Sequence, residues 1–168
     1  MAILGIDPGK TGSLALIDEI SWDLIAHLFM PTIKVASKIR VNGAAIAAWL
    51  SDYPIHHVFL EQVHAMPRDG AAGAFSFGHS AGMVEGIIMG SGLPLTLVTP
   101  QKWKKYSGLV GTDKDVARSR CIQLYPNERV LDLKGKGQAL ADALLIARYG
   151  ASTLNLGKQH YANNSTTN

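Results

Sequence analysis

Two short apolar runs at the start of the chain, Ala2–Ile6 and Leu14–Ile17, flank the polar segment Asp7–Gly12. Runs of Ile, Leu and Ala that end at a Pro/Gly cluster are typical of buried strands joined by a tight turn. A third apolar run, Leu24–Met30, ends at Pro31 and is predicted to be a strand as well. Because short turns join the three strands, we expect an antiparallel meander.

The spacing of apolar residues also predicts the later elements. Helices are expected over Gly43–Asp52, Ala81–Gly90, from Thr99 onward, over Thr112–Tyr125 and over Gln138–Tyr149, and strands over Ile55–Val63 and Pro94–Val98. Thr112 resembles the first residue of a capping box, and Gly150 is expected to end the last helix. Thr32–Val41 and Leu131–Gly137 are predicted to be loops, and Met66–Gly78 a mobile segment.

The chain has 168 residues, of which 47% are hydrophobic and 17% charged, enough for one domain with a real core. We expect that domain to span residues 1–156 and a disordered tail to span residues 157–168. No apolar run approaches the roughly 20 residues that cross a bilayer, and no secretory signal pattern is present. The single cysteine, Cys121, fits a reducing compartment and a small buried role. These features predict a cytoplasmic protein without a membrane partner.

Basic residues are concentrated in one part of the chain. The stretch Gln101–Lys136 contains nine Lys or Arg and four Asp or Glu and nets +5, so the remainder nets −2 of the total +3. Such a basic half is consistent with a phosphate-binding face. Solvated helix faces also carry Lys and Arg, so the charge alone does not decide between the two.

Three acids stand out because apolar residues surround them. Asp7 and Glu61 each lie near the end of a predicted strand, and Asp142 lies within the apolar sequence ALADALLIA. Burying a carboxylate is costly unless a metal ion or another partner offsets its charge. Oxygen ligands on two strands and a helix fit a pair of Mg²⁺ ions that hydrolyse phosphodiesters. Each acid alone also has a structural interpretation, since Asp7 can cap the turn that follows it.

Four segments give a more specific indication. In chain order they are ILGIDPGKTGS, FLEQVHAM, TDKDVARSR and ADALLIARYG. Together they resemble the RuvC-type Holliday-junction resolvases, in the short form common in bacteriophages. The resemblance implies a ribonuclease-H-like α/β fold: a mixed five-stranded sheet, its first three strands antiparallel, flanked by helices. It also implies a homodimer that nicks four-way DNA junctions with two Mg²⁺ or Mn²⁺ ions per active site.

The resemblance assigns roles to particular residues. Asp7, Glu61 and Asp142 match the metal-binding acids, and Lys114 matches a lysine that faces the scissile phosphate. His64 stands where relatives place an aromatic residue against the junction bases. The basic residues expected to bind DNA are Arg68, Lys102, Lys104, Lys105 and Arg118.

The chain departs from the family at the fourth metal ligand. Relatives carry Asp or His three or four residues before the helix acid, whereas this chain has Ala139 and Gln138 there. Gln138 lies four residues before Asp142, on the same helix face, and can offer a neutral oxygen. Asp132 in the preceding segment is the other candidate. We expect the second metal to bind more weakly than in relatives.

Two other functions remain open at this point. The missing ligand fits a junction-binding protein that has lost cleavage, which would shift labelled junctions without nicking them in Mn²⁺. The segment GIDPGKTGS also resembles the phosphate hairpin of sugar-kinase and actin-like ATPases. Those proteins need two such domains, and this chain has room for one.

Overall fold

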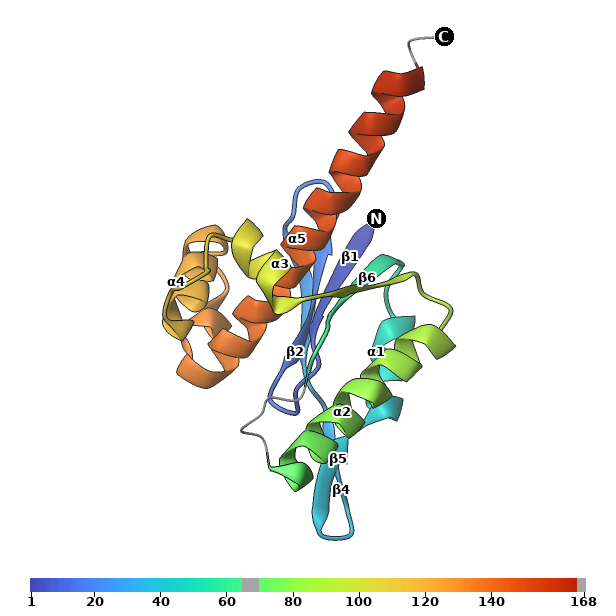
Figure 1. Ribbon diagram of the computed structural model, residues 1–168, viewed down its shortest axis with the longest axis vertical. Helices are drawn as coiled ribbons and strands as arrows, with labels where there is room; N and C mark the ends of the chain where they lie inside the picture. Colours follow the sequence, from blue (N-terminus) through green and yellow to red (C-terminus); the bar gives the residue numbers. More distant parts are fainter. Residues whose placement is uncertain (65–69, 166–168) are drawn as a thin grey trace.

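The computed structural model describes residues 1–64 and 70–165, with side chains up to Asn155. Its centre is a five-stranded sheet with strand order β3-β2-β1-β6-β7 (Figure 1). These strands are β1 (Ala2–Asp7), β2 (Ser13–Asp18), β3 (Leu24–Phe29), β6 (Ile55–Glu61) and β7 (Leu95–Val98). The first three pair antiparallel, and β6 and β7 continue the sheet in parallel with β1. The predicted fold class is confirmed.

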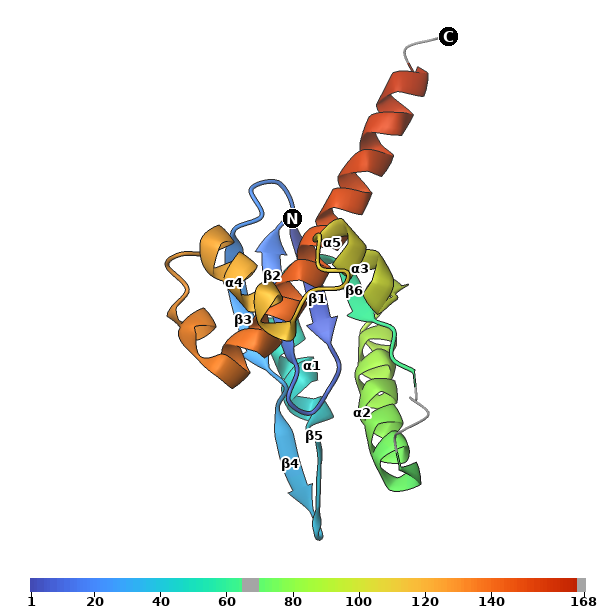
Figure 2. The same cartoon turned by 60° about the vertical axis from the view of Figure 1, so that its left-hand side comes forward.

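Helices cover both faces of this sheet. Figures 1 and 2 show α1 (Gly43–Ser51) and α2 (Ala71–Gly90) on one side. On the other side lie α3 (Pro100–Tyr106), α4 (Lys114–Leu124) and α5 (Lys134–Ser165).

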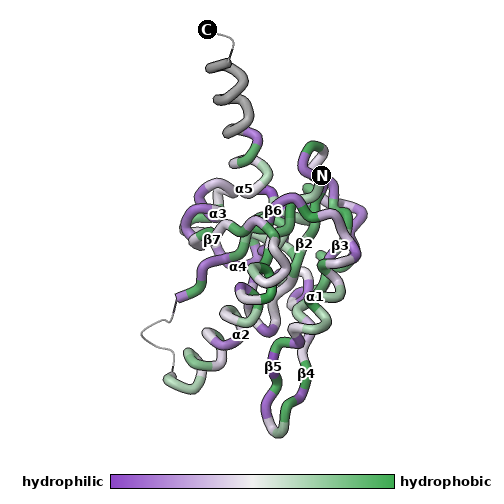
Figure 3. The backbone as a smooth tube through the Cα atoms, turned by 90° about the vertical axis from the view of Figure 1, so that its right-hand side faces the viewer, coloured by the Kyte–Doolittle hydropathy of each residue, from purple (hydrophilic) through white to green (hydrophobic). Residues whose placement is uncertain are grey.

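Residues of β1 alternate between two apolar cores. Leu4 and Ile6 join the core beneath α1 and α2, whereas Ile3 joins the core beneath α5. Strands buried on both faces read as continuous apolar runs, which explains the opening sequence. The central strands are accordingly coloured hydrophobic in Figure 3. The odd-numbered positions of β1, including Asp7, therefore face α5.

The loop predicted over Thr32–Val41 is wrong, because this segment forms a hairpin. Its strands are β4 (Thr32–Val35) and β5 (Lys38–Val41), which pair antiparallel and project away from the main sheet (Figure 1). Apolar and polar residues alternate along both strands (Figure 3). The chain reverses through Ala36, which has a φ of 53°, where glycine or asparagine would give a clear turn signal. The absence of that signal explains why the sequence pattern does not reveal the hairpin.

Two helices begin earlier than predicted. Helix α2 begins at Ala71 and not at Ala81, so most of the segment expected to be mobile is helical, while residues 65–69 lie outside the described part. Helix α5 begins at Lys134, within the predicted loop, and follows a short 3-10 helix over Arg129–Asp132. Glycine is needed at one position of this first turn, because a side chain at Gly137 would clash with the Leu131 carbonyl.

The expected helix end at Gly150 is also wrong. Gly150 lies inside α5 and contacts the Phe59 ring, where a side chain would clash. Helix α5 continues to Ser165, and the division into a domain of residues 1–156 and a disordered tail stays a prediction. At the start of α4, Asp113 and not Thr112 is the N-cap residue. Within the described residues, no helix is long and apolar enough to span a bilayer.

Helix α5 rests directly on the backbone of β1. A Cβ atom at Gly5 would collide with the Ala143 carbonyl and with the backbone nitrogen of Ala147. Glycine therefore lets the helix approach the strand closely, at the residue that follows Asp142. A hydrogen bond also joins α5 to β2, because the buried Ser13 hydroxyl donates to the Ala139 carbonyl at 3.0 Å. The position of α5 relative to β1 is thus set by backbone contact.

We predict that Gly5→Ala destabilises the protein by about 1–3 kcal/mol, the usual cost of overpacking a core. Gly73→Ala is the matched control, because nothing lies within 4 Å of its Cβ position and alanine favours a helix. Urea unfolding followed by circular dichroism measures both. Equal stability of the Gly5→Ala variant and the wild type would contradict the proposed close approach.

Candidate active site

Two acids lie side by side at the C-terminal ends of adjacent strands. Strands β1 and β6 are parallel neighbours, and Ile6 is paired with Leu60, so the next residues, Asp7 and Glu61, end adjacent strands. Phe59 and Ile3 belong to the core beneath α5, and alternation places both acids on that same face. The predicted meeting of the two strand acids is therefore supported by the register of the sheet.

The third acid, Asp142, comes to the same place on α5. Burial is the main reason that its pKa rises from 3.8 to about 7, and the negative charges of Asp7 and Glu61 raise it further. Burial also raises the pKa of Asp7, although the Gly9 N–H donates to its Oδ1 at 3.3 Å and opposes the shift. The three predicted acids therefore share one desolvated region, and they repel one another electrostatically.

Helix α3 supplies two groups that offset this repulsion. The buried Trp103 donates its indole N–H to Oε1 of Glu61 at 2.8 Å. Burial raises the pKa of Glu61, while this hydrogen bond lowers it. The positive charge of Lys104 lowers the pKa of all three acids. Lys104, predicted to bind DNA, thus lies within electrostatic reach of the carboxylates.

A cleft of about 700 Å³ opens over Asp7 and Asp142. Four lysines line it together with these acids: Lys10, Lys114, Lys134 and Lys136. A smaller cavity of about 250 Å³ adjoins it, because Lys114, Gln138 and Asp142 line both. Lys114, the predicted catalytic lysine, therefore lies at the junction of the two cavities, beside the acids. A polyanion entering this cleft would meet both cations and carboxylates.

Gln138 lies beside Asp142, as its spacing on the helix predicts. Its Nε2 donates to Oδ1 of Asp142 at 3.0 Å, and its Oε1 is buried without a hydrogen-bond partner among the described residues. An orphaned buried oxygen is costly and marks a place where a cation or another donor would be favoured. Asp132, the other candidate, is exposed, pairs with Arg129 at 3.6 Å and lines neither cavity.

The donor set fits a hard divalent ion. Three carboxylates and an amide oxygen are the ligands that Mg²⁺ and Mn²⁺ prefer, and mutual repulsion of the acids would be relieved by a cation. In the described part of the chain, however, no three His, Cys, Asp or Glu side chains are already arranged around one metal position. The residues therefore match a metal site by chemistry and not by a preformed cage.

The other residues predicted to bind DNA lie in varied surroundings. Lys102 and Lys105 are exposed on α3, and His64 is exposed shortly after β6. Arg118 donates to the Leu131 carbonyl at 3.2 Å, and its Nε is buried without a partner among the described residues. This placement gives Arg118 a role in holding α4 to the 3-10 helix that follows it. Arg68 lies outside the described residues.

Sequence reasoning misses some residues of the site. Lys134 and Lys136 fall in a predicted loop, and Lys10 falls in a predicted turn, although all three line the cleft. Trp103 carries no signal beyond its aromatic character. Two signs in the sequence point to Lys134 and Lys136: they close the basic stretch Gln101–Lys136, and the glycines beside them allow close approach of a ligand backbone.

We predict that Asp142→Asn stabilises the metal-free protein at high pH. Because the folded pKa of about 7 exceeds the ordinary value of 3.8, the folded state binds more protons than the unfolded chain between these values. The contribution of Asp142 to the free energy of unfolding therefore falls as pH rises through that range. At pH 8 the variant should exceed the wild type by about 1–3 kcal/mol, and near pH 4 the two should agree.

Urea unfolding in EDTA at both pH values measures this difference. Asp132→Asn is the control, because Asp132 is exposed, and it should show no such pH dependence. A variant that is no more stable than the wild type at pH 8 would contradict the shared desolvated site.

Comparison with known proteins identifies the fold. No protein-family model and no curated protein sequence matches the chain. Among solved structures, RuvC from T. thermophilus in complex with a Holliday junction substrate superposes with a TM-score of 0.61 at 18% identity. A second Thermus thermophilus RuvC structure gives 0.60 at 20% identity, and each match covers 94% of this chain and 97% of the other. The chain therefore has the ribonuclease-H-like fold of RuvC.

Proposed function

We propose that this protein is a divalent-metal-dependent endonuclease that resolves four-way DNA junctions. The observation that carries the proposal is the group of three mutually repelling carboxylates, two of which, Asp7 and Asp142, line a cleft that four lysines also line. The similar fold of RuvC, determined in complex with a Holliday junction, supports the choice of substrate. A cytoplasmic location in a bacterial or phage-infected cell belongs to the same proposal.

The chain's own residues would divide the work as follows. Asp7, Glu61 and Asp142 would hold two Mg²⁺ or Mn²⁺ ions, with Gln138 offering a neutral oxygen. When bound, such ions supply Lewis-acid polarisation of the phosphate and lower the pKa of water. Lys114 would orient the phosphate and stabilise the charge that develops on it. Trp103 would keep Glu61 in position through its 2.8 Å hydrogen bond.

Lysines around the cleft would supply most of the binding energy for DNA. Lys134 and Lys136 lie on the first turn of α5, and Lys102, Lys104 and Lys105 lie on α3. Neutralising backbone phosphates releases counterions, so junction affinity should depend steeply on salt. This division separates binding by the basic surface from hydrolysis by the acids.

A homodimer is part of the proposal, since a four-way junction offers two related strands. Helix α2 has a suitable surface, because Gly78, Gly82, Gly86 and Gly90 recur every four residues and all are exposed. Nothing lies within 4 Å of their Cβ positions. Each glycine costs the helix up to about 1 kcal/mol relative to alanine, and close packing by a second copy would offset that cost. Sedimentation velocity measures the oligomeric state.

The second candidate function is junction binding without cleavage. Its support is the neutral pair Gln138 and Ala139 at the place where the family that the chain resembles carries Asp or His. Incubating labelled junctions with protein and Mn²⁺ separates the two functions, because a pure binder shifts the junction without nicking it.

We predict that Asp7→Asn abolishes nicking and leaves junction binding equal or tighter. Removing one carboxylate removes metal binding, whereas the lysines that contact phosphate remain. The measurement is nicking of a labelled junction in Mg²⁺ and in Mn²⁺, with affinity from a gel shift in EDTA. Wild-type protein should nick in at least one metal, and nicking retained by Asp7→Asn would overturn the assignment of the site.

We also predict that activity is weak in Mg²⁺ and clearly higher in Mn²⁺. A neutral amide binds hard divalent ions less well than a carboxylate, and Mn²⁺ binds such sites more tightly than Mg²⁺. Gln138→Asp should therefore lower the Mg²⁺ concentration for half-maximal nicking, and Asp132→Asn should change it little. The opposite pattern, with loss of nicking only in Asp132→Asn, would make Asp132 the fourth ligand.

A further inference from the structure

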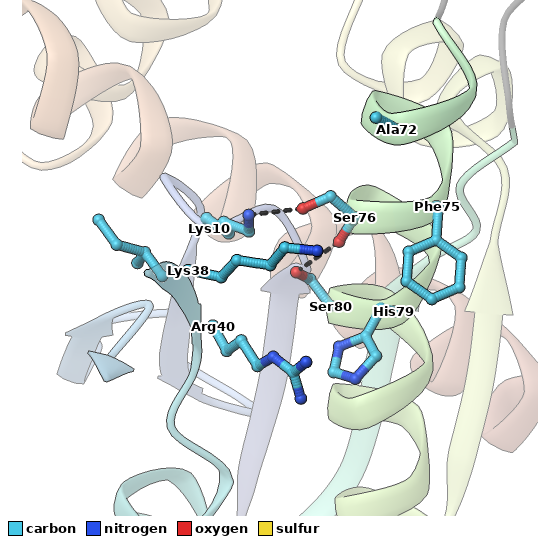
Figure 4. A pocket seen from close by; sticks show the side chains of 9 residues that line it. Lys10, Lys38, Arg40, Ala72, Phe75, Ser76, His79 and Ser80 are labelled. Atoms are coloured by element: carbon cyan, nitrogen blue, oxygen red, sulfur yellow. Dashed lines mark hydrogen bonds between the residues drawn. The ribbon is translucent and has the colours of Figure 1, made fainter. Parts of the chain in front are cut away.

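A second cavity lies next to the active-site cleft, between α2 and the β4–β5 hairpin. It has a volume of about 300 Å³ (Figure 4). Lys38 and Arg40 enter it from β5, Lys10 enters from the β1–β2 turn, and Ser76 and Ser80 enter from α2. Figure 4 shows the Lys10 and Lys38 side chains extending toward the two serines. We call this cavity the hairpin pocket.

The charge of the hairpin pocket is unbalanced. Three cations line it, and none of its described lining residues is acidic. No ion pair in the described part of the chain involves Lys10, Lys38 or Arg40. Like charges gathered around one cavity repel one another, and a bound anion would relieve that repulsion.

The pocket also has the hydrogen-bonding groups that a phosphate requires. Arginine presents a planar fork of donors that matches phosphate oxygens, and lysine adds a mobile positive charge. The Ser76 hydroxyl accepts a 2.6 Å hydrogen bond from Nζ of Lys10, while the Ser80 hydroxyl donates to the Ser76 carbonyl. The His79 ring and the Phe75 ring complete the wall on the α2 side.

Lys10 connects the hairpin pocket to the active site. It lines both this pocket and the 700 Å³ cleft that contains Asp7 and Asp142. A polymer with regularly spaced phosphates that bound in both places would pass Lys10. A single small anion would fill one place only.

The hairpin itself gives an independent argument. Two-stranded sheets are marginally stable in water. In this one the side chains of Ile33 and Ile39 are 48% and 57% exposed to solvent. Most of the hairpin is exposed, yet it places two cations, Lys38 and Arg40, at the pocket. Contact with a polyanion accounts for the position of these two cations.

We propose that the hairpin pocket binds a backbone phosphate of the DNA substrate, away from the scissile phosphate. The proposal rests on the proposed function, since it takes the ligand of the neighbouring cleft to be DNA. Lys38 and Arg40 bind this phosphate from the hairpin. Lys10, which lines both cavities, contacts the DNA strand between the pocket and the active site.

The test compares Lys38→Gln/Arg40→Gln with Lys34→Gln, which removes an exposed cation from the same hairpin but does not line the pocket. Fluorescence anisotropy in EDTA gives junction affinity over a range of salt concentrations. The slope of log affinity against log salt changes by about 0.9 for each phosphate that the protein no longer neutralises. The double variant should bind at least tenfold more weakly with a slope flatter by about 1, and Lys34→Gln should stay within about twofold of the wild type. Equal behaviour of the two variants would overturn the proposal.

Nicking at saturating junction separates this proposal from the proposed function. The readout is whether the wild type nicks at all, which is independent of the hairpin variants, because neither Lys38 nor Arg40 lines the cleft that contains the acids. A wild type that binds through the hairpin but never nicks would contradict the nuclease and leave the pocket intact. Normal nicking with unchanged salt dependence in the double variant would contradict the pocket alone.

A measurement on the wild-type protein does not depend on folding of a variant. The NMR resonances of the His79 ring, which lines the pocket, should shift when a short DNA duplex is added. The His57 ring, on β6 and bonded to Thr96, should not shift. A stationary His79 ring at saturating duplex would overturn the proposal.

Discussion

The packing of α5 on β1 at Gly5 is the contact on which the site depends. Backbone touches backbone there, so the helix has no side-chain layer through which to slide. Asp142 lies one residue before Ala143, whose carbonyl faces Gly5, and Asp7 lies two residues beyond Gly5 on the same face of the sheet. The distance between helix and sheet therefore determines the separation of these two carboxylates. A bulkier residue at Gly5 would change stability and site geometry together.

That close approach creates the electrostatic problem that the rest of the site addresses. Asp142 is desolvated beside two other carboxylates, and its pKa reaches about 7. Trp103 and Lys104, adjacent on α3, offset part of the repulsion, and Nζ of Lys104 lies 5.3 Å from the Trp103 ring centroid. Neither neutralises the cluster. The remaining negative charge is what a divalent cation would bind.

The sequence predicted the sheet and its acids because both depend on local pattern. Strands buried on two faces read as apolar runs, and a single acid within such a run is conspicuous. The hairpin, the start of α5 and the passage of α5 through Gly150 could not be predicted in this way. The two features of α5 involve close packing that a hydrophobic pattern does not reveal, of Gly150 against the Phe59 ring and of Gly137 against the Leu131 carbonyl. Glycine signals a helix end in sequence, yet here it signals close packing, and only the partner distinguishes the two.

Gln138 shows how the metal-free and metal-bound states place opposite demands on one residue. Without metal, its Nε2 donates to Asp142, which stabilises a carboxylate already repelled by two others. A fourth acid at this position would add another negative charge to the cluster and raise the cost of the metal-free fold. The amide avoids that cost, and its buried Oε1 remains without a partner among the described residues. If divalent ions bind as proposed, this oxygen gains a partner when a metal binds. Glutamine at this position therefore favours the metal-free protein, and it binds the metal more weakly than a carboxylate would.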